Sequence, residues 1–243
     1  MKPSELVLCE FVNPAEGPVE SWSPFCLKVR RALALAGLDF ASRQTYELHE
    51  FADLNPAQQV PILVADGTPI ADSTAILDAI EAWTDAPPLD PRARAEALLY
   101  EEMADSGLYG YVLASRWADP NNWPKVRATF FGPTPDEIVL PVRKSVVDGL
   151  YARDITRAGL ETCWQRHGAL LDALDGRAPV EGFWLGETLS RADLALFAQV
   201  RSMATDLTPA QADAVMSRRR LWDWIERVDA ATGGAPAERG PTR

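Results

Sequence analysis

The chain has 243 residues, of which 47% are hydrophobic and 24% charged, a composition typical of a soluble globular protein with room for two compact units. Its formal net charge of -11 argues against nucleic-acid binding, which depends on Lys and Arg that neutralise phosphates. No apolar run reaches transmembrane length, and the N-terminal one is too short for a signal peptide. Three scattered cysteines (Cys9, Cys26 and Cys163) form no Cys-x-x-Cys pair, so we expect neither a disulfide framework nor a metal site. We therefore expect a cytoplasmic protein.

The first part of the chain predicts alternating strands and helices. Residues 6–12 predict a buried strand, and residues 40–47 a second one. Between them, Ser23 and Pro24 predict the start of a helix, because serine is a favoured N-cap and proline is accommodated at the first helical position. Gly37 stands where a left-handed residue would end that helix.

A hairpin and a second helix are predicted to follow. Asp66-Gly67 is a strong hairpin signal between two apolar runs. Ser73 then has the position of an N-cap, and Ile76, Ile80 and Trp83 mark the buried face of the helix that it begins. The order strand, helix, strand, short irregular helix, hairpin, helix indicates an α/β unit of a little over eighty residues.

The rest of the chain predicts helices. The range 92–118 has one long helical pattern, weakened in the middle by Gly107 and Gly110. We expect 125–152 to be irregular, on account of Phe130-Phe131-Gly132-Pro133 and Leu140-Pro141, and a helix to follow at about 153–175. Further predicted elements are a capping box at Ser190 and Asp193 before a buried helix, and an amphipathic stretch over 209–230. Of the two histidines, we expect His49 in a surface loop and His167 at a polar position on a helix.

Four segments together resemble the cytosolic glutathione transferase superfamily. They are Ser-Pro-Phe-Cys at 23–26, Asn-Pro-Ala-Gln-Gln-Val-Pro-Ile-Leu at 55–63, Ile-Ala-Asp-Ser-Thr-Ala-Ile at 70–76 and Gly-Glu-Thr-Leu-Ser-Arg-Ala-Asp-Leu-Ala-Leu-Phe at 186–197. The resemblance implies two domains: a thioredoxin-like α/β domain over 1–84 and, after a linker at 85–91, an all-α helical domain over 92–231. A flexible tail is expected over 232–243. Within the superfamily, the first segment is similar to serine-type plant enzymes, and the C-terminal half is similar to bacterial relatives of metaxin and failed-axon-connections proteins.

The resemblance also implies roles for individual residues in binding glutathione, the co-substrate. Ser23 would hydrogen-bond the glutathione sulfur, and Gln59 would reach the glycine end. Val60, before a cis Pro61, would pair its backbone with the cysteinyl part. The γ-glutamyl end would be bound by Asp72 and Ser73. Residues that would line a hydrophobic substrate cleft are Trp22, Phe25, Tyr109, Tyr111 and Trp117.

Three functions remain open from the sequence. Ser23 and Cys26 lie three residues apart on the first turn of a helix, where the positive end of the helix dipole favours a thiolate. The first hypothesis is a glutathione transferase in which Ser23 activates the thiol for attack on a small hydrophobic electrophile. The second is a glutathione-dependent thiol transferase or reductase that uses Cys26, and the third is a non-catalytic metaxin-like interaction module. The resemblance adds a homodimer. The first hypothesis needs no metal, and we expect neither nucleic acid nor a membrane as a partner.

Overall fold

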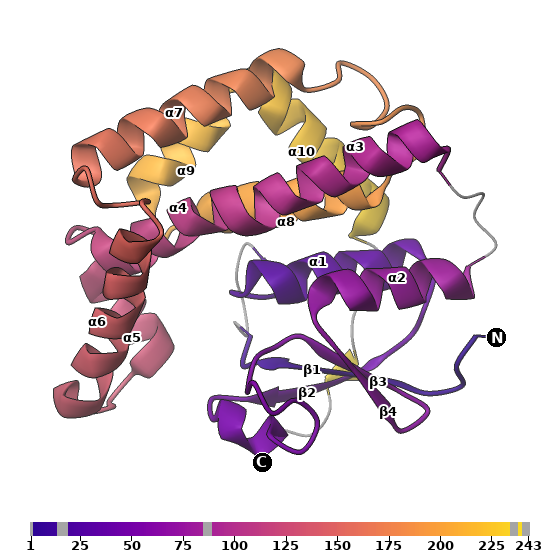
Figure 1. Ribbon diagram of the computed structural model, residues 1–243, viewed down its shortest axis with the longest axis horizontal. Helices are drawn as coiled ribbons and strands as arrows, with labels where there is room; N and C mark the ends of the chain where they lie inside the picture. The colour runs from indigo at the N-terminus through magenta and orange to yellow at the C-terminus, as the bar shows by residue number, and fades with distance from the viewer. Residues whose placement is uncertain (1, 14–18, 85–88, 234–237, 240–243) are drawn as a thin grey trace. The chain divides into compact units, whose positions relative to one another are not determined.

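The structure is a computed structural model that describes residues 2–13, 19–84, 89–233 and 238–239 (Figure 1). The chain divides into two compact units. Unit 1 comprises Met1–Glu101, Phe183–Ala198 and Glu226–Arg243, and unit 2 comprises Glu102–Gly182 and Gln199–Ile225. The predicted linker at 85–91 lies partly outside the described residues, and so does most of the predicted tail. The predicted domain boundaries therefore stay predictions.

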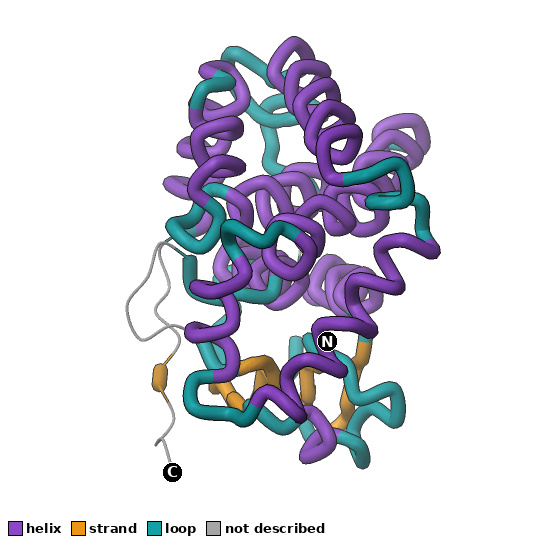
Figure 2. The backbone as a smooth tube through the Cα atoms, turned by 90° about the vertical axis from the view of Figure 1, so that its left-hand side faces the viewer, coloured by secondary structure: helices purple, strands orange, loops and turns teal. Residues whose placement is uncertain are grey.

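Unit 1 contains a mixed sheet, which is drawn in orange in Figure 2. Its strand order is β4-β3-β1-β2-β5. β1 pairs in parallel with β2 and antiparallel with β3, with Leu8 opposite Leu63 at the centre. The strands span Leu6–Phe11 (β1), Ala41–Thr45 (β2), Ile62–Ala65 (β3), Thr68–Ala71 (β4) and Glu238–Arg239 (β5). The sequence did not predict β5, whose two residues lie beyond the helices.

Helices cover both faces of this sheet. On one face lie α1 (Pro24–Leu35) and α2 (Ser73–Trp83), which pack against each other (Figure 1). On the other face, the 3₁₀ helix Leu48–Phe51 covers a small core of Cys9, Phe51 and Ile62. The predicted order of elements in this α/β part is confirmed.

Two local signals in the sequence fold as expected. Gly37 takes a φ of 60°, and the N–H groups of Gly37 and Leu38 donate to the carbonyls of Ala34 and Leu33, which closes the C-terminus of α1. Asp66 and Gly67 take φ values of 46° and 80°, the conformation of a two-residue hairpin turn between β3 and β4.

The predicted capping box lies in the second segment of unit 1, before α8 (Arg191–Met203). The Asp193 carboxylate accepts the N–H of Ser190 at 3.0 Å and the N–H of Trp184 at 2.7 Å. Asp193 is fully buried, so its carboxylate joins the start of the helix to the loop before it. The remaining helices of unit 1 are most of α3 (Pro91–Glu102) and the end of α10 (Arg219–Thr232).

Unit 2 is helical in its described residues. The predicted helix over 92–118 is continuous, but its second half contains two π-helical segments on either side of α4. One π-helical segment includes Gly107, as the weakening predicted at that position suggests. The elements are the π-helical segments Met103–Leu108 and Ala114–Ala118, α4 (Tyr109–Leu113), α5 (Trp123–Phe131), α6 (Asp136–Ala152), α7 (Leu160–Arg177) and α9 (Pro209–Met216).

The prediction for 125–152 is wrong. This range is mostly helical, and α6 runs through Pro141. Proline lacks the N–H that would bond the carbonyl of Glu137, but both residues are exposed, so water can solvate that carbonyl. The next helix begins at Leu160 rather than at about 153, and the single stretch expected over 209–230 is divided into α9 and α10.

Candidate functional site

Ser23 is the N-cap of α1, as predicted. Its φ and ψ are -84° and 119°, and its hydroxyl oxygen accepts the backbone N–H of Cys26 at 3.3 Å. The N–H of Ser23 in turn donates to the hydroxyl of the fully buried Ser21 at 3.2 Å. Because a hydroxyl donates one hydrogen in addition to accepting, the Ser23 O–H can still donate to an anion. The described first turn of α1 contains no acidic residue that would offset the positive end of its dipole.

Cys26 lies one turn further into α1 and is fully buried. Burial raises the pKa of its thiol to about 12, and the nearby Glu10 carboxylate acts in the same direction. Glu10 is itself buried on β1, where it accepts hydrogen bonds from Arg30 Nε at 2.9 Å and from the Ser42 hydroxyl at 2.6 Å. The Cys26 thiol therefore stays protonated at neutral pH and is out of reach of solvent.

A hollow of about 290 Å³ lies in unit 1 next to the start of α2. Five of the residues expected to bind glutathione line it, and Phe25 from α1 lines it too. The lining residues are Phe25, Asn55, Ala57, Gln59, Val60, Pro61, Ala71, Asp72 and Ser73. The peptide bond between Val60 and Pro61 is cis, as the resemblance implies.

The cap of α2 differs from the prediction. Asp72, and not Ser73, is the N-cap: its Oδ1 accepts the N–H groups of Thr74 at 2.9 Å and Ala75 at 3.2 Å. Ser73 is the first helical residue and is only 4% exposed. Asp and Ser are equally good N-caps, and the carboxylate also gains from the helix dipole, so the helix starts one residue earlier. Asp72 Oδ2 takes part in neither of the two bonds.

Sequence reasoning missed Asn55 and Ala57, which also line the hollow. The side chain of Asn55 accepts the N–H of Ala57 at 3.1 Å and donates to the carbonyl of Gln59 at 2.9 Å. The first of these bonds closes the turn that an asparagine side chain commonly forms with the N–H group two residues later. Asn55-Pro56 in the sequence therefore indicated this turn. The second bond depends on how the loop returns, which no local signal reports.

The five aromatic residues expected in a substrate cleft are divided between the units. Trp22 and Phe25 belong to unit 1, and the other three belong to unit 2. Trp117 packs in an aromatic cluster, with its ring centroid 5.8 Å from those of Trp123 and Phe131. The ring of Tyr111 lies 5.1 Å from that of His167, and Tyr109 is half-buried. Their role in a common cleft stays a prediction.

The sequence suggested a polar position on a helix for His167. The side chain is instead only 2% exposed and lies in the core of unit 2. His49 is exposed, as expected. Among the described residues, no group of three or more His, Cys, Asp or Glu side chains is placed to hold a metal ion. In the same part of the chain, no helix combines the length and the apolarity that crossing a membrane requires.

Comparisons with known proteins point to one family. The family described as glutathione S-transferase, N-terminal domain, matches residues 22–83. The isoprene-epoxide–glutathione S-transferase of Rhodococcus sp. (strain AD45) is 25% identical over 87% of this chain and 95% of its own length. These matches support the cytosolic glutathione transferase superfamily, which the four sequence segments also resemble.

Other relatives match a smaller share of this chain. The maleylacetoacetate isomerase of Rattus norvegicus is 37% identical over 33% of this chain and 43% of the isomerase. Solved structures share the fold along the whole chain. A glutathione S-transferase from Xanthobacter autotrophicus has a TM-score of 0.62 and 22% identity, covering 96% of both chains. The β-etherase LigF from Sphingobium sp. has a TM-score of 0.60 and 21% identity, covering 91% of this chain and 99% of its own chain.

Proposed function

We propose that this transferase binds glutathione in the hollow of unit 1 and activates its thiol as a thiolate for attack on a small hydrophobic electrophile. The observation that carries the proposal is the hollow itself, which Gln59, Val60, Asp72 and Ser73 line close to the start of α2. It combines the N-terminus of a helix with backbone from an irregular loop, which suits a short anionic peptide.

Ser23 supplies the activation in this proposal. A hydrogen bond to a charged group contributes roughly 1.5–3 kcal/mol, which corresponds to a thiol pKa lower by about one to two units. Starting near about 8.5, the pKa of the glutathione thiol would then lie near neutrality, without a general base. The dipole of α1 acts in the same direction, because no acid offsets it in the first turn.

The orientation of glutathione in this proposal is the one that the resemblance implies, and the N-terminus of α2 and the Asp72 carboxylate suit it. Its α-carboxylate would lie at the N-terminus of α2, beside Ser73, and its ammonium beside Asp72. The Val60 backbone would pair with the cysteinyl part, and Gln59 would contact the glycine end. Asp72 is suited to this role because only its Oδ1 accepts the two capping N–H groups.

The electrophile is a separate part of the proposal. The relative that matches along nearly its whole length is named for isoprene epoxide, so we propose small apolar epoxides as the first electrophiles to test. We also propose a cytoplasmic homodimer. Light scattering on a size-exclusion column should then give about twice the chain mass of 26.7 kDa.

Thiol exchange through Cys26 is a weaker candidate, because the thiol is fully buried and its pKa is raised to about 12. Retention on immobilised glutathione and elution by free glutathione test the binding step. Conjugation of an epoxide with glutathione, monitored as the loss of free thiol, tests the transfer. Binding without any transfer to a panel of electrophiles would favour the metaxin-like interaction module, and absence of binding would overturn the proposal.

A further inference from the structure

The carboxamide of Asn55 bonds in two directions across the loop that precedes β3. Its Oδ1 accepts the N–H of Ala57 at 3.1 Å, and its Nδ2 donates to the carbonyl of Gln59 at 2.9 Å. Asn55 and both of its partners line the hollow. One side chain therefore joins the two ends of the short segment that forms this wall.

The backbone of the segment is folded tightly around Asn55. The N–H of Asn55 donates to the carbonyl of Phe51 at 2.8 Å, and the carbonyl of Asn55 accepts the N–H of Gln58 at 2.9 Å. Gln58 takes a φ of 52°, a conformation that a residue with a side chain adopts only when its surroundings hold it there. The bond from Asn55 to Gln59, immediately after Gln58, is such a restraint.

The bond to Gln59 also fixes the direction of the next N–H group. The carbonyl of Gln59 and the N–H of Val60 belong to one planar peptide unit, and in a trans peptide they point in opposite directions. Because the carbonyl points at Asn55 Nδ2, the N–H of Val60 points away from it. The same bond holds the Cα atom of Gln59, from which its side chain projects.

We propose that Asn55 is a positioning residue for glutathione, which sets the Gln59–Val60 peptide so that its N–H and the Gln59 side chain both meet the tripeptide. This inference rests on the proposed function, because it assumes that glutathione occupies the hollow. It assigns Asn55 no contact with the reacting sulfur. Asn55 therefore affects how tightly glutathione binds and how its glycine end is recognised, and leaves the activation of the thiol to Ser23.

Asn55→Ser separates the two bonds of the carboxamide. A serine hydroxyl still accepts the N–H two residues on but is too short to reach the Gln59 carbonyl. It also adds no charge that would repel the glutathione carboxylates. Asn121→Ser is the matched control, since Asn121 is an exposed loop residue of unit 2. Titration calorimetry with glutathione and with γ-glutamylcysteine, which lacks the glycine, measures the effect, and thermal denaturation without ligand measures stability.

We expect Asn55→Ser to lower the affinity for glutathione by about 3- to 10-fold, the worth of one neutral hydrogen bond, and the affinity for γ-glutamylcysteine by less. KM for glutathione should rise by the same factor while kcat changes by less than about twofold. Asn121→Ser should leave both affinities unchanged. An equal loss for both ligands, together with a lower melting temperature, would show a merely structural role and overturn the inference.

Two further outcomes separate this inference from the proposed function. If the wild type binds glutathione and Asn55→Ser binds it equally well, only the role of Asn55 is overturned. If the wild type does not bind glutathione, the proposed function fails and this inference fails with it. Should the variant not fold, amide hydrogen exchange of the wild type provides the test. Glutathione should slow exchange at Ala57 and Val60, and unchanged rates at both would overturn the inference.

Discussion

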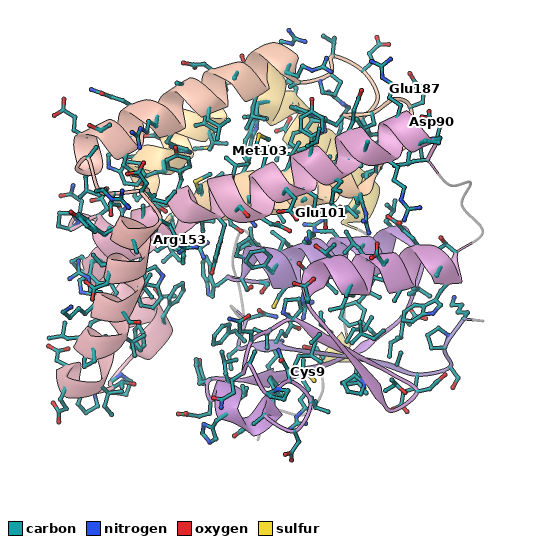
Figure 3. The ribbon with its side chains drawn as sticks, in the orientation of Figure 1. Cys9, Asp90, Glu101, Met103, Arg153 and Glu187 are labelled. Atoms are coloured by element: carbon teal, nitrogen blue, oxygen red, sulfur yellow. The ribbon has the colours of Figure 1, made fainter. Side chains whose placement is uncertain are left out.

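The ammonium of Lys28 lies 3.1 Å from the carboxylate of Glu101, and both side chains are only 1% exposed. Lys28 is on α1, and Glu101 projects from α3 toward α1 (Figure 3). The same carboxylate oxygen accepts the Thr74 hydroxyl at 2.9 Å, and Arg191 lies 3.5 Å from the other oxygen. Glu101 thus joins α1, α2, α3 and α8 within unit 1.

Removing one partner of this pair should destabilise the protein strongly. Glu101→Gln removes the negative charge from a buried ion pair, for which we expect a loss of about 3–5 kcal/mol in the free energy of unfolding, measured by urea denaturation. The double variant Lys28→Met/Glu101→Gln should recover part of this loss, because it removes the buried charge. A single variant as stable as the wild type would contradict the importance of this pair.

Asp72 combines a structural and a binding role, which two substitutions separate. Asn is as good an N-cap as Asp, so Asp72→Asn should keep the melting temperature but lower glutathione affinity by about 10-fold or more through loss of the charge. Asp72→Ala should lose the same affinity and also about 0.5–2 kcal/mol of stability. Titration calorimetry and thermal denaturation measure the two effects. Undiminished affinity in Asp72→Asn would remove the carboxylate from the binding site.

Ser23 and Cys26 should differ sharply in their effect on conjugation. Ser23→Ala should lower the rate by roughly one to two orders of magnitude, equivalent to roughly 1.4–3 kcal/mol, and move the pH midpoint of the rate upward by about one to two units. Cys26→Ser should leave the rate nearly unchanged, because the thiol is buried and protonated. Activity lost in Cys26→Ser and kept in Ser23→Ala would place the protein among the thiol-exchange enzymes.

His167 should make the stability of unit 2 depend on pH. Burial, together with the nearby Arg218, lowers the pKa of His167 to about 4, against about 6.5 in an unfolded chain. The unfolded state therefore binds the proton more readily, so the stabilising contribution of the neutral ring is complete above about pH 6.5. It falls by about 3 kcal/mol as the pH decreases toward 4.

The measurement uses the fact that the chain has only two histidines. The NMR signal of His167, which the variant His167→Gln identifies, should be that of a neutral ring at pH 5.5. His167→Gln should flatten the pH dependence of the melting temperature between pH 4 and 6.5, and His49→Gln should not. A His167 signal that titrates near pH 6.5 would contradict the expected burial effect.

The sequence predicted the features that depend on a few neighbouring residues. Gly37, the turn at Asp66 and Gly67, and the Ser190–Asp193 cap are local, and all three form as expected. Two adjacent residues that are both good caps misled the prediction at Asp72 and Ser73, since the sequence cannot say which of them starts the helix.

Other features depend on tertiary packing, which a single sequence does not report. Pro141 ends no helix, because the carbonyl that it leaves without a partner is exposed to solvent. The burial of His167 depends on aromatic rings that come from α4 as well as from its own helix. Asn55 reaches Gln59 only because the loop returns on itself.

Unit 1 is assembled from three separate parts of the chain. Arg31 on α1 donates to the Thr232 hydroxyl at 3.1 Å and lies 2.6 Å from the Asp229 carboxylate, so the start of the unit is joined to residues about 200 positions later. During synthesis, unit 1 therefore cannot complete its packing until residues up to Thr232 have left the ribosome. Contacts at such sequence separation form slowly, so the N-terminal part must wait, incompletely packed, for α10 to emerge.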